Sequence, residues 1–294
     1  MDPFNCTLQT CSIEYAFTQY QPNIAANSVY LVVFSIFLAG QVVLAICCKS
    51  WSYSGLIICG MILEILGYIA RILIHTNPFS FPYFLMNLTC IGLGPVLFSA
   101  SIYLCLSHIV ILYGEKLSLI RPKTYVLFFL CCDVACLALQ GAGGAVTSIA
   151  VHSEQLRQVG TRILIAGLAC QVGSLVAFIT CSILFFVRVM NSPQLRRKDT
   201  EQLRQTRKWR YFLCGLATAV TTILTRSVFR VIELKNGFSG GLANDEVAFM
   251  ILESLMVVIA CIPLTTFHPG LLFGDLWYKS SFFSRRNEPV LEEI

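Results

Sequence analysis

The chain has 294 residues, of which 56% are hydrophobic and only 13% are charged. Soluble globular proteins average about 25% charged residues, so this composition excludes an ordinary soluble enzyme and a disordered or nucleic-acid-binding chain. The formal net charge is +5, and most of the 14 cysteines fall inside apolar segments, where a free cysteine packs as a small hydrophobe. The composition is that of a polytopic membrane protein.

The first part of the chain, residues 1–27, is predicted to be an extracellular segment. It is interrupted by acidic residues and a proline, and it has no basic residues at its start, so it does not resemble a cleavable signal peptide. It contains Cys6 and Cys11. Both would lie on an oxidising side of the membrane, where a disulfide can persist. The sequence leaves open whether the two are bridged.

Seven largely apolar stretches follow, each long enough to cross a bilayer, which takes about 20 residues in a helix. We therefore expect an all-α fold, a polytopic membrane protein built as a seven-transmembrane-helix bundle over residues 28–273, and a cytoplasmic tail at 274–294. The predicted spans are Ser28–Cys48, Tyr53–Ile74, Tyr83–Tyr113, Tyr125–Ala150, Thr161–Val187, Tyr211–Leu234 and Val247–Phe273.

The distribution of lysine and arginine predicts how these spans are oriented. No basic residue occurs before Lys49, and fifteen of the 21 fall in the loops that would be cytoplasmic if the N-terminus were outside. The opposite side would hold only Arg157, Arg162 and Lys235. The positive-inside rule then predicts an outside N-terminus and a cytoplasmic C-terminus. The basic loop that ends at Arg210 fits a solvated cytoplasmic loop, with contact to anionic lipid as the alternative.

Charged and polar side chains inside the spans are the main functional signal, because a charge at mid-bilayer costs about 2.5–3.5 kcal/mol on insertion scales. They recur at spacings of three, four or seven, which place them on one face of each helix. Four spans carry such a stripe: Glu64, Tyr68 and Arg71 in the second, Asp133 and Gln140 in the fourth, Arg226, Arg230 and Glu233 in the sixth, and Glu246 and Glu253 in the seventh.

The four stripes allow two interpretations that are compatible with each other. They could form an ion-pair network that fixes helix register and binds nothing. They could also line a polar cavity in the outer half of the membrane that receives the head group of an amphiphile.

Three familiar seven-helix or intramembrane classes do not fit. An opsin needs a Schiff-base lysine in the seventh span, and none is there. A G-protein-coupled receptor normally carries an Asp-Arg-Tyr-like motif where this chain has Ser107-His108-Ile109-Val110. The four histidines divide two and two between the predicted sides, so a three-histidine zinc site is not available. We therefore expect no catalysis, no metal site and no cofactor.

Several short motifs together resemble a known family. They are Glu64-x-x-Gly67-Tyr68-x-x-Arg71, Ala100-Ser101-Ile102-Tyr103, Cys132-Asp133 followed by Gln140-Gly141-Ala142-Gly143-Gly144, Gly167-x-x-x-Gln171, the run from Arg226 to Glu233, and Gly237-x-x-Gly240 with Glu246. Each motif alone is weak, but their order along almost the whole chain is similar to that of the fungal RTA-like proteins (resistance to aminocholesterol), also called the lipid-translocating exporter family.

The resemblance implies a multi-pass protein of a fungal plasma membrane or endomembrane that moves amphiphilic lipids, with sphingoid-base-like, sterol-like or porphyrin cargo. Its partners would be membrane lipids or amphiphilic small molecules and not nucleic acid, and a homo-oligomer stays open. The alternatives are a seven-helix lipid-sensing receptor or stress-response protein and, third, an intramembrane lipid hydrolase. The expected ligand-binding residues are Glu64, Tyr68, Arg71, Asp133, Gln140, Gln171, Arg226, Arg230, Glu233, Glu246 and Glu253.

Overall fold

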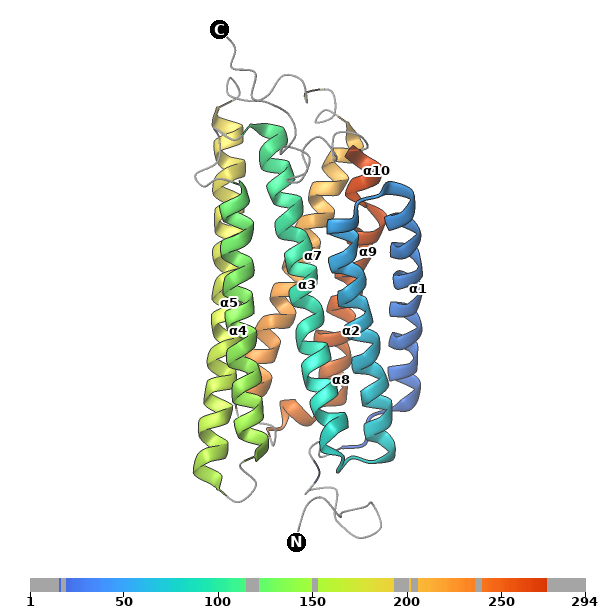
Figure 1. Ribbon diagram of the computed structural model, residues 1–294, viewed down its shortest axis with the longest axis vertical. Coiled ribbons are helices and arrows are strands. Elements are labelled where there is room, and N and C mark those ends of the chain that lie inside the picture. Colours follow the sequence, from blue (N-terminus) through green and yellow to red (C-terminus); the bar gives the residue numbers. More distant parts are fainter. Residues whose placement is uncertain are drawn as a thin grey trace.

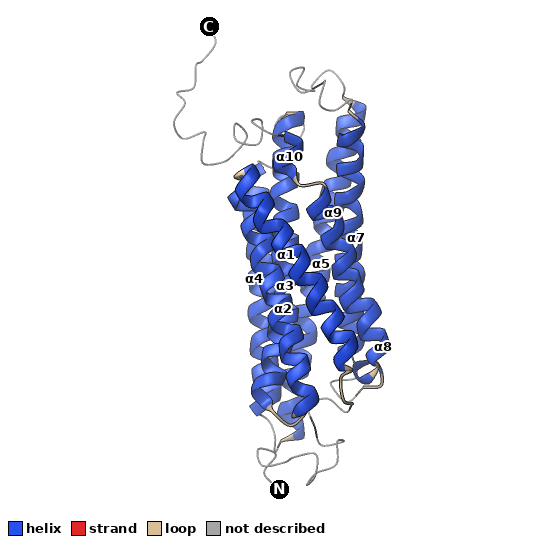
Figure 2. Ribbon diagram, turned by 90° about the vertical axis from the view of Figure 1, so that its right-hand side faces the viewer, coloured by secondary structure: helices blue, strands red, loops and turns tan. Residues whose placement is uncertain are grey.

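The structure is a computed structural model that describes residues 16, 20–114, 122–149, 153–192, 201, 206–235 and 240–273. Cys6 and Cys11, the predicted cytoplasmic tail and most of the basic loop that ends at Arg210 lie outside the described residues. Throughout the described ranges the fold is all-α and contains no strand, as Figure 2 shows. The predicted fold class is confirmed.

Within these described ranges, seven helical segments are long and apolar enough to span a membrane, so the chain is a multi-pass membrane protein. The first six are single helices, and the seventh is built from three consecutive pieces. The single helices are α1 (Ile24–Cys48), α2 (Trp51–Thr76), α3 (Phe81–Tyr113), α4 (Pro122–Ile149), α5 (Glu154–Asn191) and α7 (Arg207–Leu234). The seventh segment consists of α8 (Glu246–Ala248), the π-helix η7 (Phe249–Leu255) and α9 (Met256–Thr266). The short helices η6 (Leu242–Asn244) and α10 (Pro269–Phe273) flank it.

The helices run along the long axis of the bundle, with α4 and α5 paired at one side and α1 at the other (Figure 1). Helix α3 packs against both α2 and α4 and is buried along most of its length. The helices α1, α4 and α5 instead leave most of their spanning residues outside the buried interior, and the exposed ones in α1 include Val29, Val32 and Ile36. An apolar exterior around a buried central helix is what lipid contact requires.

Two helix boundaries differ from the prediction by more than about four residues, each for a local reason. Helix α5 begins at Glu154 instead of Thr161, because the hydroxyl of Ser153 caps it by accepting a hydrogen bond from the backbone N–H of Leu156 at 3.4 Å. The last span was expected as one helix to Phe273, but its helix ends at Thr266 and α10 starts after a break. Hydropathy alone predicts neither the earlier start of α5 nor the break after Thr266.

The break after α9 is held by His268, which is fully buried. Its Nδ1 accepts the backbone N–H of Gly270 at 3.1 Å, so Nε2 carries the proton and donates to the Ser54 hydroxyl at 2.9 Å. The aromatic ring of Tyr53 packs edge-on against the imidazole, and the Tyr53 hydroxyl donates to the carbonyl of Leu264 at 2.8 Å. These contacts fasten α2 to the end of the seventh segment at the predicted cytoplasmic end.

Candidate functional site

The centre of the candidate site is a buried ion-pair cluster between α7 and η7. Arg226 pairs with Glu253 and also donates to the backbone carbonyl of Ile91 in α3 at 2.6 Å. One turn further along α7, Arg230 Nη1 donates to Glu233 at 2.8 Å, while its Nε lies 3.9 Å from the Glu253 carboxylate. All four charged side chains are buried. Buried charges need such partners, because an unpaired one is strongly destabilising.

Glu64 joins this cluster from α2. Its side chain lies against Gly94 of α3, where a β-carbon would come within 2.6 Å of the Glu64 carboxylate. Among the described residues, Glu64 Oε1, Glu253 Oε2 and Arg226 Nε are buried without a hydrogen-bond partner. Three unsatisfied polar atoms in one cluster are unusual for a native interior and call for an explanation.

The other two members of the α2 stripe also make contacts of their own. Arg71 donates to the hydroxyl of Tyr20, and its guanidinium lies over the ring of Phe249, 3.6 Å from the centroid. Burial raises the pKa of the Tyr20 phenol, against the opposing effect of Arg71, so Tyr20 is neutral at ordinary pH. Tyr68 is buried and stacks on Tyr30 at 5.6 Å. These contacts tie α2 to α1, η7 and the segment before α1.

Asp133 of α4 also has its own partners. Its carboxylate accepts hydrogen bonds from the Tyr103 hydroxyl of α3 at 2.9 Å and from the Ser174 hydroxyl of α5 at 3.2 Å. Two turns along α4, Gln140 donates to Gln171 of α5 at 2.8 Å. The α4 stripe therefore joins α3, α4 and α5 at two levels.

Glu246 lies at the start of the seventh segment and contacts α1. Its carboxylate accepts the backbone N–H of Asn23 at 2.6 Å, next to the Asn23 side chain that caps α1. The seven-residue spacing had placed Glu246 and Glu253 on one face. The π-helix η7 begins between them and contains Glu253, and it has more residues per turn than an α-helix. The two carboxylates meet different elements.

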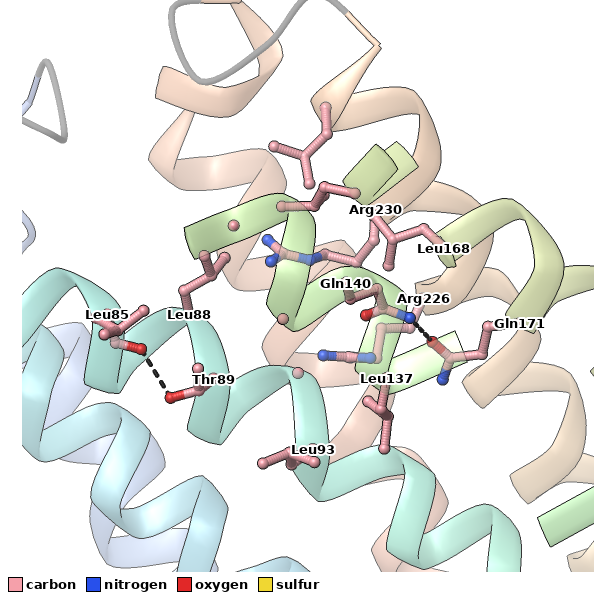
Figure 3. A pocket seen from close by; sticks show the side chains of 15 residues that line it. Leu85, Leu88, Thr89, Leu93, Leu137, Gln140, Leu168, Gln171, Arg226 and Arg230 are labelled. Atoms are coloured by element: carbon pink, nitrogen blue, oxygen red, sulfur yellow. Dashed lines mark hydrogen bonds between the residues drawn. The ribbon is translucent and has the colours of Figure 1, made fainter. Parts of the chain in front are cut away.

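A cavity of about 170 Å³ lies beside the ion-pair cluster, between α3, α4, α5 and α7. Figure 3 shows Gln140, Gln171, Arg226 and Arg230 converging on it, with leucines of α3 facing them. On the predicted orientation this is the outer half of the bundle. Four of the predicted site residues thus line one cavity, and Glu64, Glu233 and Glu253 are buried outside its wall.

Several partners of these residues could not be picked out from the stripes alone. Tyr103 was visible only through the Ala100-Ser101-Ile102-Tyr103 motif, and no pattern singled out Ser174 or the carbonyl of Ile91. The cavity leucines look like ordinary spanning residues. Within the described part of the chain, no three His, Cys, Asp or Glu side chains form a group that could hold a metal ion.

Comparison with known proteins adds a family to this geometry. Residues 57–275 match the profile of a family described as RTA1 like protein. The chain is similar to "Sphingoid long-chain base transporter RSB1" of Saccharomyces cerevisiae, with 33% identity covering 86% of this chain and 73% of the relative. It is also similar to "Protoporphyrin uptake protein 1" of that organism, with 28% identity covering 74% of this chain and 68% of the relative. No solved structure matches the chain.

Proposed function

We propose that this chain, which belongs to the RTA1-like family, translocates amphiphilic lipids across a membrane. The observation that carries the proposal is the cavity beside the ion-pair cluster, which sets two arginines and two glutamines against leucines inside a seven-helix membrane bundle. Relatives named for sphingoid-base transport and protoporphyrin uptake support the same class of cargo. We propose transport and not catalysis.

The cavity would act by giving a polar head group a route through the hydrocarbon. Uncompensated polar groups in the bilayer core are costly because no water is there to bind them. In the cavity a head group would meet Gln140, Gln171, Arg226 and Arg230, while the tail would lie against Leu85 and the other apolar side chains.

Flux into reconstituted liposomes tests this function. The full chain is reconstituted, a fluorescent sphingoid base or phospholipid is added to one leaflet, and its appearance in the other leaflet is followed by quenching. We expect faster movement than in protein-free liposomes. If every amphiphile moved at the same rate in liposomes with and without the protein, the proposal would be refuted. Binding without flux would support the receptor alternative instead.

A pair of glycine variants links the flux to the cavity. Gly92 lines the cavity and Gly173 of α5 does not, and a β-carbon at either glycine meets nothing within 4 Å. Leucine is the better helix former, so neither Gly92→Leu nor Gly173→Leu should unfold the protein. Only Gly92→Leu places a side chain in the cavity. We expect Gly92→Leu to slow flux about tenfold and Gly173→Leu to leave it unchanged; equal flux in the two variants would place the route elsewhere.

A further inference from the structure

The charged groups that the described residues place on the cavity wall have one sign. Arg226 and Arg230 line the cavity, and none of the described residues that line it carries a carboxylate. Glu233 and Glu253 pair with these arginines from outside the wall, and Glu64 is buried beside them. A molecule that enters the cavity therefore meets guanidinium groups before any carboxylate.

Part of the hydrogen-bonding capacity of these arginines is unused. Both bonds of Arg226 to described residues leave from Nη2, and its Nε has no partner there. Arg230 donates from Nη1 to Glu233. Each guanidinium has five N–H donors, so both retain donors beyond their bonds to the described residues. The single bond between Gln140 and Gln171 also leaves one amide NH₂ and one carbonyl oxygen of the pair free to bind a guest.

We infer that this cavity binds an anionic head group, a phosphate or a carboxylate, in preference to a cationic amine; the inference rests on the proposed function. Guanidinium groups match the geometry of carboxylate and phosphate oxygens and bind them with two parallel hydrogen bonds. An ammonium group carries only donors, and in the same place it would meet the guanidinium groups while Glu233 and Glu253, already paired with them, lie outside the wall.

The size of the cavity limits what enters it. Ligand pockets commonly hold about 300–1,000 Å³, and this cavity holds about 170 Å³, or about six waters at the liquid volume of each. That space takes a head group and its first carbons but not a long acyl chain. The leucines of α3, Leu85, Leu88 and Leu93, offer apolar surface for the next carbons.

Binding of matched probes tests the preference. Octadecyl phosphate, octadecanoate, octadecanol and octadecylamine share a chain and differ in the head group. Each is titrated against the full chain in nanodiscs of phosphatidylcholine at neutral pH, and binding is measured calorimetrically. We expect at least one of the two anions to bind about tenfold or more tightly than the amine, and comparing the anions separates phosphate from carboxylate recognition. Equal or tighter binding of octadecylamine would overturn the inference.

A carboxylate placed on the wall should weaken anion binding. Gln140→Glu puts a carboxylate beside Arg226 and Arg230, and the amide of Gln171 can turn to donate to it. The control, Gln155→Glu, makes the same change at an exposed position of α5. We expect the tighter anion to bind Gln140→Glu about tenfold more weakly and Gln155→Glu unchanged. Equal anion binding in these variants would contradict the site. Gln171→Glu repeats the test if Gln140→Glu does not fold.

The binding experiment and the flux experiment test the inference and the proposed function separately. If octadecylamine binds best and sphingoid base still crosses the liposome membrane, the head-group inference is wrong and the proposed function stands. If an anion binds selectively and nothing crosses, the inference stands and transport is refuted. If no probe binds and none crosses, both are wrong.

Discussion

The pairing of Arg226 with Glu253 makes the sharpest stability prediction. Arg226→Met removes the partner of a fully buried carboxylate, and breaking a buried pair in this way costs about 3–5 kcal/mol. The double variant Arg226→Met/Glu253→Met replaces both charges by apolar side chains of similar length and should recover most of that loss. Unfolding free energies in one detergent give the comparison. A double variant as unstable as the single one would mean that the pair is not the source of the loss.

Asp133 gives a smaller effect with a matched control. Tyr103→Phe removes a hydrogen bond to its carboxylate, and a bond to a charged group contributes about 1.5–3 kcal/mol. Tyr125→Phe makes the same change where the hydroxyl donates to the neutral carbonyl of Phe178 at 3.1 Å, and there we expect about 0.5–1.5 kcal/mol. Thermal unfolding of the two variants checks the order. If Tyr125→Phe lost as much stability as Tyr103→Phe, the hydrogen bond from Tyr103 to Asp133 would be no stronger than one to a neutral carbonyl.

How far these contacts could be predicted depends on where the partner lies. Arg230 and Glu233 are three residues apart on one helix, and their spacing alone predicts that they meet. Arg226 meets Glu253 only because α7 packs against η7. Spacing within a helix names the residues that share a face, but the packing of helices decides which faces touch.

Among the elements, α4 and α5 depend on glycines for their close approach. A β-carbon at Gly143 would meet the carbonyl oxygen of Gly160 at 2.7 Å and the backbone of Leu164 as well. Since backbone cannot move aside as a side chain can, Gly143→Ala should force the helices apart, at about 1–3 kcal/mol. Gly173→Ala is the control, because its β-carbon meets open space and alanine favours the helix by about 1 kcal/mol. Melting temperatures should fall for the first variant only. A melting temperature of Gly143→Ala at or above wild type would show that the helices do not need this contact.

The seven spans themselves were predictable, because each is a long apolar run and hydropathy identifies such runs directly. The π-helix was not. It widens the turn around Glu253 without any change in composition, and a spacing rule built on 3.6 residues per turn does not hold through it. Its position next to the ion-pair cluster agrees with the frequent placement of π-helical turns at functional sites.

Across the bundle, the predicted polar stripes divide into separate contacts around one central cluster. Arg71 and Glu246 fasten the start of α1 and the residues before it, and Asp133 joins three helices. Glu64, Arg226, Arg230, Glu233 and Glu253 gather at the centre, beside the cavity. The two interpretations of the stripes therefore overlap. Ion pairing organises the bundle, and Arg226 and Arg230 take part in it while they also line the cavity that is the proposed place of binding.

Photolabelling tests most directly whether the amphiphile occupies this cavity. A long-chain amphiphile with a diazirine next to its head group is irradiated with the full chain in nanodiscs, and the labelled peptides are identified by mass spectrometry. We predict labels in the cavity stretches 85–93, 137–144 and 164–171, competed by unlabelled amphiphile and lost in Gly92→Leu. Labels confined to the exposed apolar face of α1 around Val32, and unchanged in Gly92→Leu, would contradict the account.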